Sequence, residues 1–466
     1  MKLKRLIGAV VFSIVLTGCI LLTFRTLSWK DTGEDYVSSM EQLKNTPKNS
    51  IDVVFLGSSH VYCGVLPEVL WDEYGIASFD MAVSGADRYS SYYQLKYLLK
   101  KQNPKVVMVD IYGLITGKME VEGNIYRNLM SMGMSKESAD LIKMDADKEQ
   151  FFDYFFKWPV VHSRYRELKK GDFVKNPVNS YMKGEELYWK STPMYKEEGI
   201  DEVTACSELD EETVNWLKDM QELSAKENFR LIVMAIPMHF SEEDKMTSNA
   251  ISAYCSENGI SFLDFDAYAS GIGLAFDEDY LDEYHLNSFG AAKLSSFMGK
   301  YMSVNMNLED HRGEKKYADW DEDFAWYQKE KLFYSLENAK DMTEYFQILS
   351  NIDAATCVMI LDGECEFDYS NYEEYFNTVG IEEWDALEGG TFVIKNNEAV
   401  RTSDNLYLEV DKVPFHIYYD KESEVFLADT YDFVFEGRQE FCNLLVIDET
   451  TGMTRSAKGF YLKNEE

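Results

Sequence analysis

Basic residues are scarce in this chain of 466 residues, which holds 46 lysines and arginines against 82 aspartates and glutamates. The formal net charge of −36 excludes the concentrated basic surface that nucleic-acid phosphates require. The deficit is deepest in residues 306–466, which contain 37 acidic and 14 basic residues. We therefore expect no nucleic-acid partner, and we expect the last third of the chain to repel polyanions.

Motifs for metals and nucleotides are also missing. The seven cysteines have neither CxxC nor Cys/His zinc spacing, and no Gly-Lys-Ser/Thr run marks a P-loop. We expect no metal, no cofactor and mostly buried free thiols, although Cys357 and Cys365 could pair in an exported protein. The acidic run at residues 362–368 lacks an EF-hand pattern, so a solvated loop is favoured over a calcium site.

The chain has enough apolar material to fold, and it is too long for one hydrophobic core. Apolar residues make up 45% of the sequence and aromatic residues 14%, as in globular proteins rather than disordered ones. A length of 466 residues favours two domains with additional segments.

The first long apolar run spans residues 6–24 and contains no charge. A helix of this length can cross a hydrocarbon core of about 30 Å, and the basic residues before it favour a cytoplasmic N-terminus. A cleaved signal peptide and a lipobox ending at Cys19 are the alternatives. No small-residue cleavage site follows the run, which continues past the cysteine. We expect a single-pass cell-membrane anchor within residues 1–30, with the rest of the chain extracytoplasmic.

Short apolar runs then alternate with helix-like segments. The expected strands cover residues 51–57, 76–83, 105–113, 229–237 and 260–266, and the expected helices cover residues 65–75, 88–102, 212–228, 248–259 and 289–302. This alternation of apolar strands and helices indicates a parallel sheet with helices on both faces. We predict a three-layer α/β/α domain over residues 31–305, with a helical insertion at about residues 114–211.

The chain after residue 305 has a different composition. Residues 306–340 are acidic and helix-like, and they are expected to connect two domains. Residues 341–466 contain short β-branched and aromatic runs separated by turn residues. This pattern indicates a β-rich, sandwich-like domain with one or two helices.

Polar residues stand where a serine-based site could form. Ser58 and Ser59 follow the first strand, Gly85 follows the second, and Asp282 and His285 precede the last helix. A serine nucleophile needs a base to accept its proton and a carboxylate to orient that base. The i,i+3 spacing of Asp282 and His285 suits this pairing, and Gly85 can bring a backbone N–H to a developing oxyanion. Each residue alone is more often structural, so the combination carries the prediction.

This order of blocks resembles the SGNH (GDSL-type) hydrolase superfamily, and within it the membrane-anchored branch related to DltD and AlgX. The resemblance rests on the stretches FLGSSHVYCGV, DMAVSGA, PKVVMVDIYGL and DEYHLNSFGAAKL and covers roughly residues 51–301. It implies a nucleophile at Ser59, a general base at His285 and an orienting carboxylate at Asp282. The backbone N–H groups of Ser59 and Gly85 would then form the oxyanion hole.

Further polar residues adjoin these blocks. Ser58 stands where the superfamily has aspartate, and it stays open as an alternative nucleophile. His60 and His239 are expected to line the pocket, since His60 points elsewhere than its neighbour Ser59 and His239 follows another strand. The superfamily's third block, Gly-x-Asn-Asp, is missing, because the corresponding strand ends in DIYG. The resemblance therefore implies a differently built oxyanion hole.

The β-rich part resembles interleukin-like EMT inducer (ILEI) domains in the stretches YFNTVGI, GGTFVIKNNEAV and CNLLVIDETTGMTRSAKGF. This resemblance implies binding to a carbohydrate or to a partner. Together the two resemblances imply a serine acyltransferase or esterase that modifies a surface or exported polysaccharide or glycolipid. Relatives imply a membrane-bound O-acyltransferase as a partner. The competing hypothesis is a non-catalytic polysaccharide-binding or assembly scaffold, which the missing third block supports.

Overall fold

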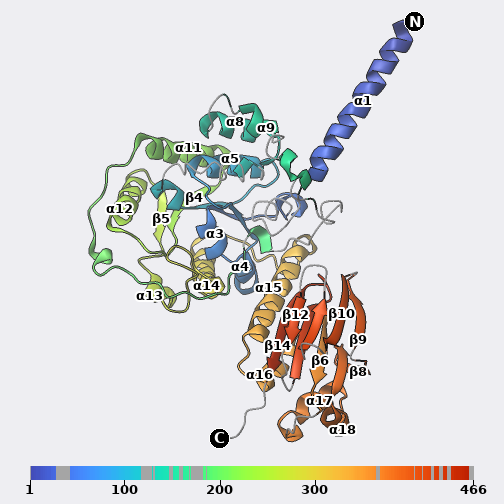
Figure 1. Ribbon diagram of the computed structural model, residues 1–466. Helices are drawn as coiled ribbons and strands as arrows, with labels where there is room; N and C mark the ends of the chain where they lie inside the picture. The colour runs from blue at the N-terminus through green and yellow to red at the C-terminus, as the bar shows by residue number, and fades with distance from the viewer. Residues whose placement is uncertain are drawn as a thin grey trace. The chain divides into compact units, whose positions relative to one another are not determined.

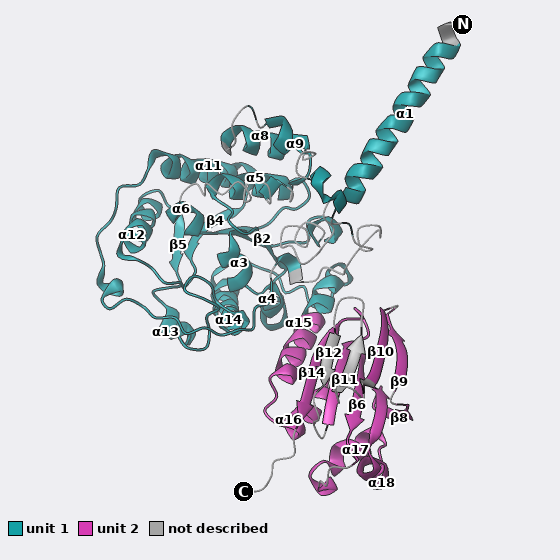
Figure 2. Ribbon diagram, in the orientation of Figure 1, with its two compact units in different colours: residues 1–324 teal, residues 325–466 magenta. Residues whose placement is uncertain are grey.

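The structure is a computed structural model in which the chain divides into two compact units, unit 1 (residues 1–324) and unit 2 (residues 325–466) (Figures 1 and 2). The described residues are 2–27, 42–116, 128–129, 132–145, 149, 151–156, 161–166, 168, 182–184, 186–363, 368–403, 405–411, 413–420, 425–429, 434–437 and 442–460. The boundary between the units falls within helix α15 (Ala318–Glu337). Residues of the predicted connector, 306–340, thus belong to both units.

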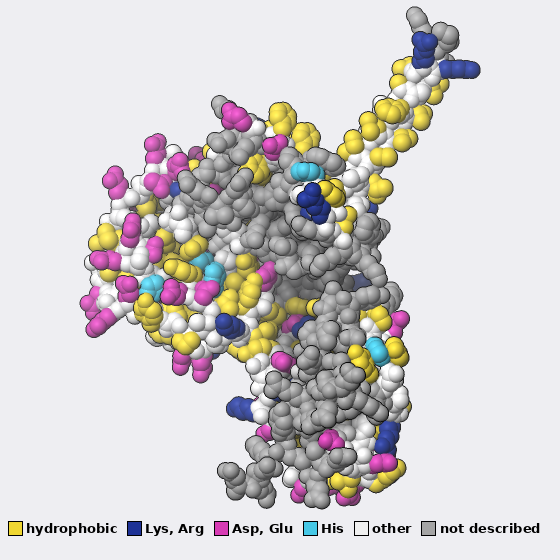
Figure 3. Space-filling view, viewed as in Figure 1, with side chains coloured by type: hydrophobic (Ala, Val, Ile, Leu, Met, Phe, Trp, Pro, Cys, Tyr) yellow, Lys and Arg dark blue, Asp and Glu magenta, His cyan; other side chains and the backbone are white. Residues whose placement is uncertain are grey.

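The N-terminal apolar run forms helix α1 (Lys2–Leu27). Within the described residues, Lys4–Leu27 is the one stretch long and apolar enough to cross a membrane, with a mean hydropathy of 2.5, and a signal sequence meets the same criterion. Apolar side chains cover this helix, and basic side chains gather near its N-terminal end (Figure 3). The predicted apolar helix is therefore confirmed.

A five-stranded parallel sheet forms the centre of unit 1 (Figure 1). Its strands are β1 (Val53–Gly57), β2 (Ser78–Ala82), β3 (Val106–Asp110), β4 (Arg230–Ala235) and β5 (Ser261–Asp264). They lie in the order β2-β1-β3-β4-β5, and every neighbouring pair is parallel. The predicted α/β fold with a parallel sheet is confirmed.

Helices pack on both faces of this sheet, because alternate residues of a strand point to opposite faces. On β1, Val54 and Leu56 belong to one buried cluster, and Val53 and Phe55 belong to another. The first cluster includes side chains of α5 (Arg88–Leu98), α11 (Glu211–Glu227) and α12 (Glu242–Glu257), and the second those of α3 (Ser59–Gly64), α4 (Pro67–Tyr74) and α14 (Ser288–Asn305). The result is a three-layer α/β/α core.

The strand order changes direction next to β1. The chain passes from β1 to β2 on one side and then crosses to β3 on the other side of β1. In open parallel sheets, ligands bind at the carboxyl ends of the strands that flank such a point. Ser59 follows β1, and Tyr112, the first residue of α6 (Tyr112–Ile115), follows β3. Both residues therefore lie where a binding site is expected.

Helices α3 and α12 differ from the sequence prediction, each for a local reason. Helix α3 was not predicted, because six residues give too short a pattern for helical periodicity to be recognised. Helix α12 begins at Glu242 rather than at residue 248, because Ser241 and Asp244 form a capping box. Ser241 Oγ accepts the Asp244 N–H (3.2 Å), and the Asp244 carboxylate accepts the Ser241 N–H (3.1 Å).

The described part of the predicted insertion contains helices α8 (Lys136–Asp145) and α9 (Phe151–Phe156), separate 3-10 turns, and an irregular strap over residues 186–197. Backbone hydrogen bonds tie this strap to the segment before α14. The Thr192 N–H donates to the Tyr280 carbonyl (2.8 Å), and the Met194 N–H donates to the Phe276 carbonyl (2.7 Å). The strap therefore braces the segment that leads into the loop of Asp282 and His285.

Unit 2 contains two antiparallel sheets, ordered β14-β13-β6-β7-β8 and β12-β11-β10-β9. The strands are β6 (Ala355–Leu361), β7 (Gly390–Lys395), β8 (Glu398–Thr402), β9 (Asn405–Val410), β10 (Val413–Asp420), β11 (Val425–Asp429), β12 (Val434–Gly437), β13 (Cys442–Asp448) and β14 (Thr454–Phe460). One buried cluster joins β6 and β13 to β9 and β10, and another joins β6 and β13 to helices α15, α16 (Met342–Leu349), α17 (Glu373–Val379) and α18 (Glu383–Glu388). The predicted β-rich C-terminal part is confirmed, with helices packed against the first of its sheets.

Candidate active site

Ser59 is the first residue of α3 and lies just beyond the end of β1. Gly57 ends the strand, and Ser58 takes the N-cap position with an extended backbone (φ −102°, ψ −153°). A side chain at residue 57 would not fit, because an added Cβ would lie 2.6 Å from Cγ2 of Val61 and 3.3 Å from Cβ of Asp110. A strand–turn–helix unit that needs glycine at its bend thus presents the half-buried Ser59 at the carboxyl edge of the sheet.

Asp282 and His285 lie on a tight loop before α14. Tyr280 and Leu286 close the loop as an isolated antiparallel bridge. Asn287 follows as the N-cap of α14, and its Oδ1 accepts two N–H groups of the first helical turn at 3.0 and 3.1 Å. The bridge and the cap fix both ends of the loop, so its side chains have a defined direction.

Three side chains form a continuous hydrogen-bonded row. His285 Nε2 lies 2.7 Å from Ser59 Oγ, and His285 Nδ1 lies 2.8 and 3.0 Å from the two carboxylate oxygens of Asp282. Asp282 Oδ1 also accepts the backbone N–H groups of Tyr284 (2.8 Å) and His285 (3.0 Å). A carboxylate beside Nδ1 favours the tautomer that carries its proton there, which leaves Nε2 free to accept the hydroxyl proton of Ser59.

Ser58 and His60 contact each other instead of completing this row. Ser58 Oγ lies 3.4 Å from His60 Nδ1, and both residues are buried. The ring of His60 stacks on Tyr112 with centroids 3.7 Å apart, and its centroid lies 4.9 Å from that of His285. Burial, and secondarily the charge of His285, lower the pKa of His60 well below its ordinary value. His60 is therefore a neutral ring beside the His285 imidazole.

Gly85 and His239 follow two other strands of the sheet, β2 and β4. Gly85 has a positive φ of 66° and follows β2, whose Ala82 pairs with Gly57 of β1. It therefore lies at the same sheet edge as Ser59. His239 follows β4, and its N–H donates to the carbonyl of Glu283 (2.7 Å), inside the loop of Asp282 and His285. His239 thus supports the backbone of this loop.

Asp110 and Tyr112 are neighbours of the site that sequence reasoning did not single out. The two carboxyl oxygens of Asp110 accept the N–H groups of Tyr112 (3.1 Å) and Ile236 (3.2 Å). Burial raises the pKa of Asp110 to about 7, against the opposing effect of these hydrogen bonds. Asp110 thereby fixes the turn that places Tyr112 against His60. The available signal was the DIYG sequence, which ends an apolar run predicted to be a strand.

Cysteines and acidic residues of the described chain form no recognisable metal centre. No cluster of three or more His, Cys, Asp or Glu side chains suited to a metal occurs among the described residues. Cys19, Cys206, Cys255 and Cys357 are free thiols. Cys365, the partner considered for Cys357, and most of the acidic run at 362–368 lie outside the described residues.

No protein-family model and no curated protein matches this chain. Among solved structures, a Bacteroides fragilis protein with a provisional assignment as an acylhydrolase is 11% identical, with a TM-score of 0.29 and coverage of 59% of this chain and 98% of its own. A family two carbohydrate esterase from Clostridium thermocellum, an active-site mutant, is 10% identical, with a TM-score of 0.27 and coverage of 57% and 66%. Similarity of this extent carries no argument about function.

Proposed function

We propose that this protein is a serine acyl enzyme that acts on acyl esters of carbohydrates through Ser59, His285 and Asp282. The supporting observation is the row in which Ser59 Oγ, His285 Nε2, His285 Nδ1 and the Asp282 carboxylate follow one another at 2.7 and 2.8 Å. A hydroxyl, an imidazole and a carboxylate in this order are the groups that serine acyl transfer requires.

The first half of the proposed reaction forms an acyl-enzyme. Ser59 Oγ attacks the ester carbonyl while His285 Nε2 takes the hydroxyl proton, and the Asp282 carboxylate stabilises the resulting imidazolium. Backbone N–H groups of Ser59 and Gly85 are proposed to receive the negative charge that develops on the carbonyl oxygen. The C–O bond to the leaving alcohol then breaks, and His285 returns its proton to the alkoxide.

The second half releases the acyl group to an acceptor. His285 takes a proton from the acceptor oxygen, which attacks the ester on Ser59, and the proton then returns to Ser59 Oγ. Water as the acceptor gives an esterase, and a sugar hydroxyl gives a transferase. We favour transfer of an acetyl group to a surface polysaccharide or glycolipid, with acyl groups supplied through a membrane-bound O-acyltransferase.

The proposed acceptor is neutral or weakly charged. Acidic side chains outnumber basic ones on the visible face of unit 1 (Figure 3), and the net charge of the chain is −36. A dense polyphosphate would be repelled unless cations screened it. Helix α1 would hold the site outside the cytoplasmic membrane, which is where such a glycan would be modified.

Ester turnover tests this proposal. The full chain in detergent is given p-nitrophenyl acetate, and release of the leaving group is followed for the wild type, Ser59→Ala and His285→Ala. Turnover that both substitutions abolish supports the acyl enzyme. Equal rates of leaving-group release for all three proteins would contradict it and would favour the glycan-binding scaffold. The scaffold hypothesis also fits the DIYG stretch, where Asp110 accepts hydrogen bonds and the asparagine that would donate one to an oxyanion is missing.

A further inference from the structure

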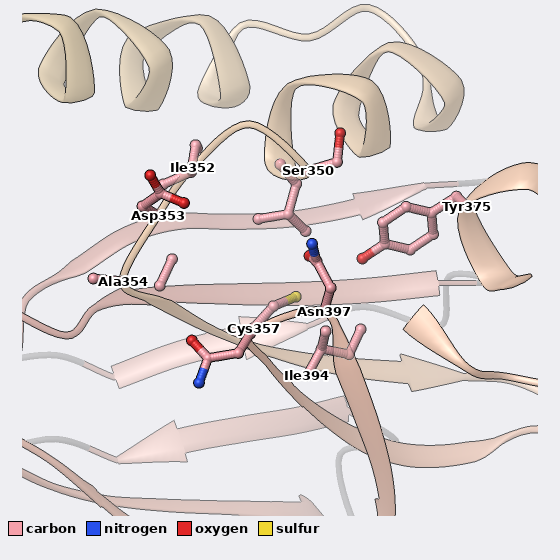
Figure 4. Close-up of a pocket in the computed structure, with 11 residues that line it drawn as sticks. Ser350, Ile352, Asp353, Ala354, Cys357, Tyr375, Ile394 and Asn397 are labelled. Atoms are coloured by element: carbon pink, nitrogen blue, oxygen red, sulfur yellow. The ribbon is translucent and has the colours of Figure 1, made fainter. Parts of the chain in front are cut away.

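Unit 2 contains two adjoining cavities that share Ser350 and Tyr375. The smaller cavity has a volume of about 70 Å³ and the larger about 190 Å³. The smaller one lies between the loop before β6 and the β7–β8 hairpin (Figure 4). The larger one lies between α16 and α17 and the 3-10 turn η7 (Tyr369–Asn371). Both are distant in sequence from Ser59, and nothing in the proposed acyl chemistry uses them.

The hydroxyl of Tyr375 points into the smaller cavity (Figure 4). This oxygen is almost fully buried, and it has no hydrogen-bond partner among the described residues. Its ring stacks flat on Phe346, with centroids 3.7 Å apart and an interplanar angle of 4°, which stabilises this orientation of the ring. A buried hydroxyl without a partner is unfavourable. A group that enters the cavity from outside the chain would remove this cost.

The larger cavity is lined by neutral polar groups and rings. Its lining comprises Thr343, Phe346, Gln347, Ser350, Asn371, Tyr372, Glu374, Tyr375 and Thr378. Hydroxyl and carboxamide groups can donate and accept hydrogen bonds at the same position, whereas rings offer apolar surface. No lysine, arginine or histidine lines the cavity, and one carboxylate, Glu374, does. This lining disfavours an anion and suits a neutral molecule with many hydroxyl groups and an apolar face.

We propose that the two cavities around Tyr375 are a binding subsite for one neutral sugar residue. A closed cavity of about 150 Å³ binds benzene, and the larger cavity of about 190 Å³ is open on one side, so one pyranose can place its ring inside with hydroxyl groups at the opening. The smaller cavity is too small for a second ring, and it receives a substituent of the sugar, whose polar atom accepts from the Tyr375 hydroxyl. Gln347, exposed on α16, and Asn371 hydrogen-bond the ring hydroxyls at the open side.

Ligand-detected NMR on the full chain in detergent tests this subsite. Saturation transfer to N-acetylglucosamine, glucose and glucuronic acid is compared at equal millimolar concentrations. We expect signals from the neutral sugars and a weaker signal from the anionic one. Tyr375→Phe removes one hydroxyl, and Gln347→Ala truncates an exposed side chain, so both variants should fold. Each should weaken binding of the neutral sugars about fivefold, as expected for one lost hydrogen bond.

Two controls separate this subsite from the acyl site. Tyr407→Phe also removes a tyrosine hydroxyl in unit 2 but lines neither cavity, so it should bind sugar as the wild type does. Ser59→Ala should also bind sugar normally, even though it removes ester turnover. The proposal is overturned if neither neutral sugar binds, if glucuronic acid binds equally well, or if Tyr375→Phe and Gln347→Ala both bind like the wild type.

Discussion

Replacing Asp282 by asparagine perturbs the candidate triad by only one atom. The asparagine oxygen can still accept the backbone N–H groups of Tyr284 and His285, which now bond to Asp282 Oδ1. The asparagine NH₂ group would then face Nδ1 of His285 in place of the oxygen that lies 3.0 Å away. The asparagine oxygen would still lie 2.8 Å from Nδ1, but the neutral amide cannot stabilise the imidazolium that forms when His285 takes the proton of Ser59, and its NH₂ group faces the N–H on Nδ1. His285 would therefore be a weaker base toward Ser59.

The expected loss is about 10³-fold in kcat/KM. The same change in serine proteases costs about 10⁴-fold. The side chain of Asp282 is 49% exposed and that of His285 is 21% exposed, so water already screens the charge that the substitution removes, and this reduces the penalty. A 10³-fold loss corresponds to about 4 kcal/mol of transition-state stabilisation.

The assay compares kcat/KM for p-nitrophenyl acetate between the wild type, Asp282→Asn and Glu283→Gln. Glu283 is exposed and lies in the same loop, so its substitution removes one negative charge without touching Nδ1 of His285. We expect Glu283→Gln to stay within threefold of the wild type. A loss of less than tenfold for Asp282→Asn, or equal losses for the two variants, would refute the assigned role of Asp282.

Three further changes follow from the geometry. Ser58→Ala should keep most ester turnover, because Ser58 contacts His60 and not His285; inactivity of a folded Ser58→Ala would reopen the choice of nucleophile. Gly57→Ala should lower the free energy of unfolding by roughly 1–3 kcal/mol, because its Cβ would lie 2.6 Å from Val61 Cγ2, and an unchanged denaturant midpoint would contradict this. Asp110, with a pKa of about 7 against about 3.9 unfolded, binds its proton more tightly in the folded state. The protonated carboxyl therefore stabilises the folded state by about 4 kcal/mol below about pH 4, and this stabilisation is lost as the pH rises to 7. The free energy of unfolding, measured in urea, should show this pH dependence for the wild type and not for Asp110→Asn. The same pH dependence in both proteins would refute it.

The main elements of unit 1 could be predicted because their signals are local. The strands around Val53–Gly57 and Arg230–Ala235 are near-continuous apolar runs, which burial on both faces of a parallel sheet requires. Asp282 and His285 were recognisable for the same reason, since they stand three positions apart in the sequence and a helix follows. The connection to Ser59, 226 residues earlier in the chain, came from the order of the blocks.

The features that could not be predicted depend on which strands and helices become neighbours in the fold. Short stretches of sequence contain no signal for this. Tyr112 reaches His60 only because β3 pairs with β1. The strap over residues 186–197 has no periodicity, and only its hydrogen bonds to the segment before α14 show what it supports. The cavities around Tyr375 likewise arise from side chains of α16, α17 and the β7–β8 hairpin, which meet only in the folded unit.

Identification of an acyl group on the enzyme tests the central claim most directly. The full chain is mixed briefly with p-nitrophenyl acetate, quenched in acid and digested, and the peptide that contains Ser58 and Ser59 is sequenced by tandem mass spectrometry. We predict an added acetyl group on Ser59, which accumulates in the wild type and is absent from Ser59→Ala and His285→Ala. An adduct on Ser58, or turnover without any adduct on this peptide, would contradict the account.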